Sequence, residues 1–174
     1  MINMKLKRLS IIFLGLCLGM FTISITDKIV WGQTNQAAQI EQLIQESKQQ
    51  ARQGESLEAI ETLEQLLIIV QRENNRELEA WSWLGLGFNH SQIQEYPQAL
   101  ESYKQALTIY QDINNLSGVA ISLSNMGNVY VNMGKAADAI NYYQQALEVY
   151  TEMGDASGIE KTQNNINEVN ERLR

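Results

Sequence analysis

Cysteine, histidine and proline are almost absent from this 174-residue sequence, in which each occurs once, as Cys17, His90 and Pro97. A single cysteine excludes a disulfide scaffold. One cysteine and one histidine also exclude the common zinc modules, which need four such ligands. With one proline, a loop-rich all-β fold is disfavoured. The length suits one ordinary domain better than two.

Positive charge is also scarce. The chain has 13 Lys and Arg against 20 Asp and Glu, a formal net charge of -7. This balance argues against a broad nucleic-acid-binding surface. With 44% hydrophobic and 19% charged residues, the composition is typical of a globular chain, neither disordered nor built of many membrane spans.

The first residues differ from the rest. Lys5, Lys7 and Arg8 precede an uncharged apolar run over residues 9–25. A basic start followed by an apolar stretch is typical of a secretory signal, and cleavage after Gly32 is expected. Since the run is at the short edge of what crosses a bilayer, an uncleaved anchor is the alternative. Residues 1–32 are therefore predicted to be a signal peptide or membrane anchor, and the protein to be exported (periplasmic or extracellular) or membrane-anchored.

The strongest pattern is an internal repeat of 40 residues. Within each copy the matching positions are spaced one, three, four and three residues apart, which collects them on one helix face. The matching sets are Ala59, Ala99 and Ala139; Ile60, Leu100 and Ile140; Leu63, Tyr103 and Tyr143; Leu67, Leu107 and Leu147; and Val70, Tyr110 and Tyr150.

Turn signals repeat at the same interval. Four residues with side chains that cap helix N-termini are 40 apart, namely Asn35, Asn75, Asn115 and Asp155. Residues that tolerate a left-handed helix end precede three of them, as Asn74, Asn114 and Gly154, and a second break falls at Gly54, Gln94 and Gly134. The predicted helices are 36–53 and 56–73, 76–93 and 96–113, 116–133 and 136–153, and a final 156–173.

The pattern resembles the tetratricopeptide repeat in its longer form. The W-x2-L-G-x2-Y opening of that family is matched by Trp83-x2-Leu86-Gly87-x2-His90 and by Leu123-x2-Met126-Gly127-x2-Tyr130. Its A-x3-F-x2-A pattern is matched by Ala99, Tyr103 and Ala106, and by Ala139, Tyr143 and Ala146. The first repeat departs from the pattern, because Ser47 replaces the glycine.

The resemblance implies an all-α, right-handed α-solenoid over residues 33–174. It would contain three helix pairs, in repeats of about 36–75, 76–115 and 116–155, and a C-terminal capping helix in 156–174. Three stacked pairs share a core that one pair cannot form alone. Gly87 and Gly127 are expected where helices approach closely, with Tyr103 and Tyr143 filling the space. Along the last helix, one apolar side is expected to cover the third repeat, formed by Ile159, Ile166, Val169 and Leu173.

Little in the sequence indicates catalysis. His90 is the one side chain with an ordinary pKa suited to general-base work, but it takes the packing position of Tyr130 in the next repeat. A run of glutamates is expected to form one solvated helix stripe, made of Glu55, Glu58, Glu61 and Glu64. No phosphate-binding loop or serine elbow occurs. We therefore predict no enzyme, no cofactor and no metal site.

The resemblance implies that the first helix of each pair lines an inner, concave wall. The residues facing inward would be Glu41, Ile44, Lys48 and Ala51; Trp81, Leu84, Phe88 and Ser91; and Ile121, Ser124, Asn128 and Val131. Because Trp83 and Leu86 serve the core, Trp81, Leu84 and Phe88 are free to form a binding hot spot. The alternative is that the neighbouring helix, or the segment that follows the signal, covers them. The predicted partner-binding residues are Trp81, Leu84, Phe88, Ile121, Asn128 and Lys48.

These residues predict a non-enzymatic interaction scaffold or adaptor that binds a peptide or helix of another protein in the groove. Some members of the family bind C-terminal carboxylates through lysine, arginine and asparagine, but the inward positions offer only Lys48 and Asn128, which disfavours that mode. Two alternatives stay open. One is a structural repeat protein that self-associates into a homo-oligomer, and the other is a peptide sensor without an output domain.

Overall fold

The computed structural model describes residues 25–173 of the chain. These residues form seven α-helices and no strand. The helices are α1 (Ile25–Gln53), α2 (Ser56–Arg72), α3 (Arg76–Gln92), α4 (Tyr96–Asp112), α5 (Leu116–Asn132), α6 (Ala136–Met153) and α7 (Ala156–Arg172). A compact unit begins at Gln36, and the packing described below concerns this unit.

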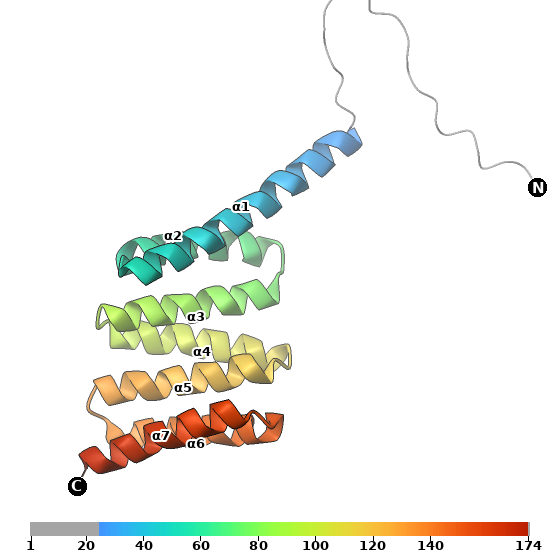
Figure 1. Cartoon of the computed structure of the whole chain (residues 1–174). Coiled ribbons are helices and arrows are strands. Elements are labelled where there is room, and N and C mark those ends of the chain that lie inside the picture. The colour runs from blue at the N-terminus through green and yellow to red at the C-terminus, as the bar shows by residue number, and fades with distance from the viewer. Residues whose placement is uncertain (1–24, 174) are drawn as a thin grey trace, which may run out of the picture. The chain divides into compact units, whose positions relative to one another are not determined.

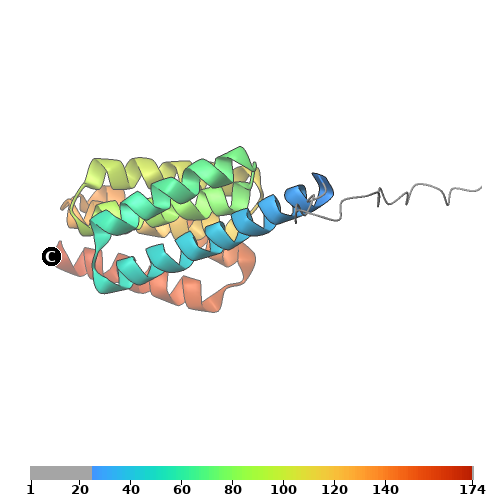
Figure 2. The same ribbon diagram turned by 90° about the horizontal axis from the view of Figure 1, so that it is seen from above.

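The unit is an all-α repeat solenoid, which confirms the predicted fold class. Each helix from α2 onward packs against the next helix in the chain, and the pairs follow one another along a single stack (Figure 1). Figure 2 shows the same stack from above, with helices of successive pairs lying over one another. Local, sequential packing of this kind is what makes a repeat protein nearly one-dimensional.

Three of the four predicted N-caps form. The side-chain oxygen of Asn75 accepts a hydrogen bond from the Leu78 amide at 3.1 Å, and Asn115 accepts one from Gly118 at 2.9 Å. Asp155 bonds the Gly158 amide at 3.1 Å in the same way. Each contact satisfies an amide of the first helical turn that has no partner within its own helix. Helices α3, α5 and α7 therefore begin where the sequence predicts.

Asn35 is the exception, and its prediction as an N-cap is wrong. Helix α1 already begins at Ile25, so Asn35 lies inside it and the first helix is longer than predicted. The segment 25–34 contains no glycine or proline apart from Gly32, and helix propagation through one glycine costs only about 1 kcal/mol.

The predicted breaks have the left-handed backbone that they require. Asn74, Gln94 and Asn114 have φ values of 54°, 63° and 55°. The equivalent turns at Gly54, Gly134 and Gly154 have positive φ as well. Because only glycine adopts this region without steric cost, Gln94 is the least expected residue among the six.

Close approach of the helices depends on glycine and tyrosine together. A Cβ atom at Gly87 would lie 2.6 Å from the Tyr103 ring, and one at Gly127 would lie 2.6 Å from the Tyr143 ring. Ala99 and Ala139 beside these contacts have no exposed surface. The predicted pairing of small residues with tyrosine rings is confirmed in both repeats.

Helix α7 covers the third repeat with part of the predicted face. Val169 is buried against Ala139 and Tyr143, and Ile166 packs on the same cluster. Leu173 does not join them: it lies beyond the last residue of α7 and is 63% exposed. Its inclusion in the apolar side is wrong because the helix ends before the side chain can reach the core.

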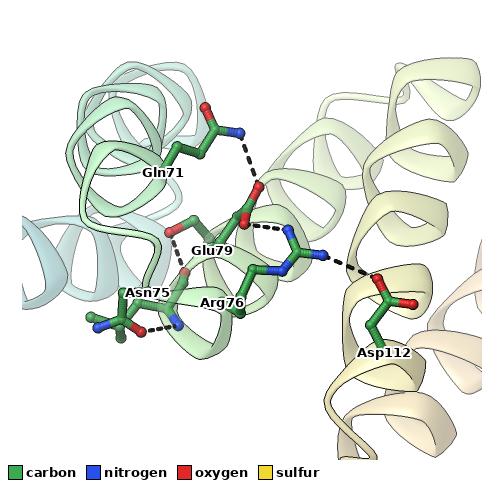
Figure 3. A network of polar contacts seen from close by, with 7 residues as sticks. Gln71, Asn75, Arg76, Glu79 and Asp112 are labelled. Atoms are coloured by element: carbon green, nitrogen blue, oxygen red, sulfur yellow. Dashed lines mark hydrogen bonds and ion pairs between the residues drawn. The ribbon is translucent and has the colours of Figure 1, made fainter.

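A polar network ties the first two repeats together (Figure 3). Arg76 pairs with Glu79 at 2.7 Å within α3 and with Asp112 of α4 at 3.1 Å. Gln71 of α2 donates a hydrogen bond to the other carboxylate oxygen of Glu79 at 3.1 Å. Since Glu79 is only 8% exposed, these partners compensate the burial of its charge.

The predicted signal or anchor, residues 1–32, lies outside the described residues except for its last part, in α1. None of the helices between Ile25 and Arg172 is long and apolar enough to span a bilayer.

Candidate binding groove

Helix α3 places three predicted binding residues on one face. Trp81, Leu84 and Phe88 are three and four positions apart, which is the spacing of one helix stripe. Phe88 is 43% exposed, whereas Trp81 and Leu84 are half-buried. Leu86 is buried in the core as predicted. Phe88 is thus the exposed residue of the stripe, whereas Trp81 and Leu84 pack on the core.

A cavity of about 240 Å³ opens along this stripe. It brings together four of the six predicted binding residues, Lys48 among them, with side chains from α1, α2 and α5. The lining residues are Ser47, Lys48, Ala51, Leu63, Trp81, Leu84, Gly85, Phe88, Asn89 and Asn125. Its walls are mainly apolar, which is the usual composition of a ligand pocket.

Lys48 stands at the edge of this cavity. Its Nζ lies 5.3 Å from the centre of the Trp81 ring, within the range of a cation–π interaction. Lys48 is exposed, so its ammonium group can reach a ligand that lies on Trp81.

The other two predicted residues belong to a second, smaller hollow of about 90 Å³. It is lined by Ile121, Ser124, Asn125, Asn128, Tyr150, Lys161, Thr162 and Asn165. Asn125 contributes to both hollows and joins them. The six predicted residues therefore divide into two groups. One, on α1 and α3, is apolar except for Lys48, and the other, on α5, has polar neighbours.

The side chain of Asn128 is held in place by a hydrogen bond from a buried residue. The hydroxyl of Tyr143 donates a hydrogen bond of 2.6 Å to Oδ1 of Asn128. Burial, together with the nearby Glu168 carboxylate, raises the pKa of Tyr143 to about 12, and Arg172 opposes part of that rise. The hydroxyl consequently stays protonated and remains a donor to Asn128 over the ordinary pH range.

Charge is distributed unevenly over these hollows. Neither lining contains an acidic side chain, while Lys48 faces one and Lys161 the other. Helix α5, between them, carries no charged residue. In a chain with a net charge of -7, these two linings favour a negatively charged ligand over a positively charged one.

Several lining residues were not predicted. Lys161 and Asn165 come from the capping helix, and Gly85, Asn89 and Asn125 lie beside the predicted stripes. The 40-residue offset relates Gly85, Asn125 and Asn165, and this register is the signal that could have found them. Lys161 also supplies a cation that the count of inward positions did not include.

The prediction of one inward-facing residue on α1 is wrong. Ile44 is only 9% exposed and belongs to the core cluster with Leu43 and Leu63. Of its predicted neighbours on the same helix, Ala51 lines the cavity and Glu41 is exposed. The inner face of α1 is therefore narrower than the stripe that the resemblance implies.

His90, near the end of α3, has a partner in the connection to α4. Its Nδ1 lies 2.8 Å from a carboxylate oxygen of Glu95, and the imidazole is half-buried. The pair joins the end of α3 to the residue before α4. Within residues 25–173, no group of three or more His, Cys, Asp or Glu side chains could hold a metal ion, and the predicted glutamate stripe on α2 is exposed.

Comparison with known proteins identifies the family to which this chain belongs. Two models described as "Tetratricopeptide repeat" match residues 49–112 and 120–151, together more than half of the chain. No curated protein sequence matches it.

Solved structures share the fold at low sequence identity. The apo form of RapI superposes with a TM-score of 0.71 at 19% identity, covering 78% of this chain and 50% of its own. The chain thus spans half the length of RapI. The TPR domain of Arabidopsis FLU gives 0.62 at 18% identity, covering 65% of this chain and 95% of its own. A tpr-like protein from Chlorobium tepidum gives 0.63 at 15% identity, covering 79% and 98%. With its repeats, helix pairs and family matches in agreement, the chain belongs to the tetratricopeptide-repeat family.

Proposed function

We propose that this protein is a non-enzymatic adaptor that binds a segment of a partner protein on the groove formed by Lys48, Trp81, Leu84, Phe88, Ile121 and Asn128. Repeat scaffolds of this family serve protein interaction in general. The observation that carries the proposal is the cavity of about 240 Å³ beside Trp81 and Phe88. An exposed aromatic anchor beside an apolar cavity is the composition of an interaction hot spot.

The test is site-specific photocrosslinking of the full chain in its own cells. A photoreactive residue in place of Phe88 should capture a foreign protein, because the side chain is exposed in the groove. The matched control is the same residue in place of Thr108, which is exposed on α4. Trp81→Ala should abolish capture from position 88. A melting temperature of that variant close to that of the native chain would show that the fold persists. Equal capture from both positions, or none from position 88, contradicts the proposal.

Self-association is the second candidate function. Leu57 and Ile68 on α2 are 62% and 60% exposed, and two such residues on one helix favour contact with another apolar surface. A mass that rises with concentration and returns to the monomer in Leu57→Ser/Ile68→Ser would support it. A constant monomeric mass would contradict it.

We propose that the adaptor acts outside the cytoplasm or at the membrane surface. The support is the basic start and apolar run of residues 1–32 in the sequence. Sequencing the N-terminus of the protein purified from cells tests this: a start at residue 33 indicates a cleaved signal, and an intact start in the membrane fraction indicates an anchor. An intact N-terminus in the cytoplasmic fraction contradicts both.

A further inference from the structure

Asn89 carries a hydrogen-bond acceptor that the protein does not use. The side chain is 1% exposed, and its Nδ2 donates to the backbone carbonyl of Gly85 at 2.9 Å. Because a carbonyl can only accept, this contact fixes which end of the amide faces Gly85. The Oδ1 of Asn89 has no hydrogen-bond partner in the protein. A buried acceptor of this kind is costly unless something donates to it.

The surroundings of Asn89 are specific to the second repeat. In the third repeat the same position is Val129 and the position of Gly85 is Asn125. Gly85 also lines the cavity. A Cβ there would lie 3.0 Å from a methyl carbon of Leu63, so the absence of a side chain lets α3 lie close to Leu63. Asn89, whose Oδ1 has no protein partner, therefore belongs to a lining with apolar walls and three other polar side chains. The apolar walls are Leu63, Trp81, Leu84 and Phe88, and the other polar side chains are Ser47, Lys48 and Asn125.

The volume of the cavity and the charge of its lining restrict the kind of ligand that it can bind. At about 240 Å³ the cavity is smaller than the ~300–1,000 Å³ of sites for drug-sized molecules, and it suits one large side chain. Lys48 at the edge, with no acidic residue in the lining, favours a carboxylate beside that side chain.

We propose that the cavity takes one aromatic side chain with a polar hydrogen, a tryptophan or a tyrosine of the partner segment, whose N–H or O–H donates to Oδ1 of Asn89. An Asp or Glu next to it in the partner pairs with Lys48. This proposal rests on the proposed function and specifies the chemistry of the partner.

The test uses single-residue probes on the full chain, followed by the backbone amide shifts of Gly85 and Asn89 in NMR titrations. N-acetyl-tryptophan offers the indole N–H and a carboxylate. Its 1-methylindole derivative lacks only the donor and should bind about three- to tenfold more weakly. N-acetyltryptophanamide lacks the carboxylate and should also bind more weakly, at low salt. N-acetyl-tyrosine compared with N-acetyl-phenylalanine decides whether a phenol serves as well as an indole.

Variants assign each effect to its residue. Asn89→Val, which installs the residue of the third repeat, should remove the difference between the tryptophan probe and its methylated form. Lys48→Gln should remove the difference between acid and amide, whereas Lys104→Gln on α4 should not. Equal binding of the methylated and unmethylated probes to the native chain would overturn the proposal, as would a donor preference that survives Asn89→Val.

The experiments can contradict either proposal independently of the other. Partner capture from position 88 without any donor preference in the probes would leave the adaptor function and overturn the aromatic-donor chemistry. Donor-selective probe binding without a crosslinked partner would overturn the adaptor function and the assignment to a partner side chain.

Discussion

The hydroxyl of Tyr143 on α6 donates a 2.6 Å hydrogen bond to Asn128 on α5. This bond connects the core to the groove wall, since Tyr143 is 2% exposed and Asn128 is exposed. At the equivalent place in the second repeat, Tyr103 packs near Gly87, and Phe88 replaces Asn128. One scaffold position thus presents an apolar residue in one repeat and an oriented amide in the next.

This bond predicts a measurable coupling between core and groove. Tyr143→Phe keeps the ring and removes the hydroxyl, so it should lower the free energy of unfolding by about 0.5–1.5 kcal/mol in urea denaturation. In a double-mutant cycle with Asn128→Ala, the two losses should be smaller together than their sum, because both remove the same bond. Strictly additive losses would show that the bond does not contribute.

Stability should fall at high pH. Burial raises the pKa of Tyr143 to about 12 and also raises that of Tyr103, against an ordinary value of about 10. Because the folded pKa values exceed the unfolded ones, this contribution is fully present below pH ~10 and is lost as the pH rises toward and through the folded values. The urea midpoint measured between pH 8 and 12 should decline above pH ~10. Tyr143→Phe should flatten the decline, and an unchanged slope would contradict the assignment.

Two glycines on the inner helices should respond differently to alanine. Gly127→Ala places a Cβ atom 2.6 Å from the Tyr143 ring, so overpacking should cost about 1–3 kcal/mol. Gly85→Ala places one 3.0 Å from the flexible end of Leu63, and the gain in helix propensity of about 1 kcal/mol should offset the contact. Thermal unfolding of the two variants tests the difference. Equal destabilisation would mean that Tyr143 can move aside.

Asn89→Val should stabilise the protein in the absence of a partner. The substitution removes a buried acceptor that has no protein partner, and the gain should be about 1 kcal/mol after the loss of the bond to Gly85. Urea denaturation of the full chain measures it, with Asn125→Val, a half-buried lining residue, as the control. A loss of stability in Asn89→Val would mean that the acceptor is already satisfied in the free protein.

The sequence by itself was sufficient for the repeat and for most helix ends. Asn75 and Asn115 cap helices through amides only three residues away, so the relevant chemistry is local. The face shared by Trp81, Leu84 and Phe88 also follows from helix periodicity alone. Asn35 has the same residue type as the true caps, and it fails because the chain before it is already helical.

Only the tertiary structure decided which side chains meet in the groove. The cavity takes residues from α1, α2, α3 and α5, and Lys161 reaches the second hollow from the capping helix. Whether Ile44 faces the core, or Asn89 lacks a donor, depends on distances between helices far apart in sequence. Periodicity determines the face of a helix on which a residue lies, while helix packing determines what that face encounters.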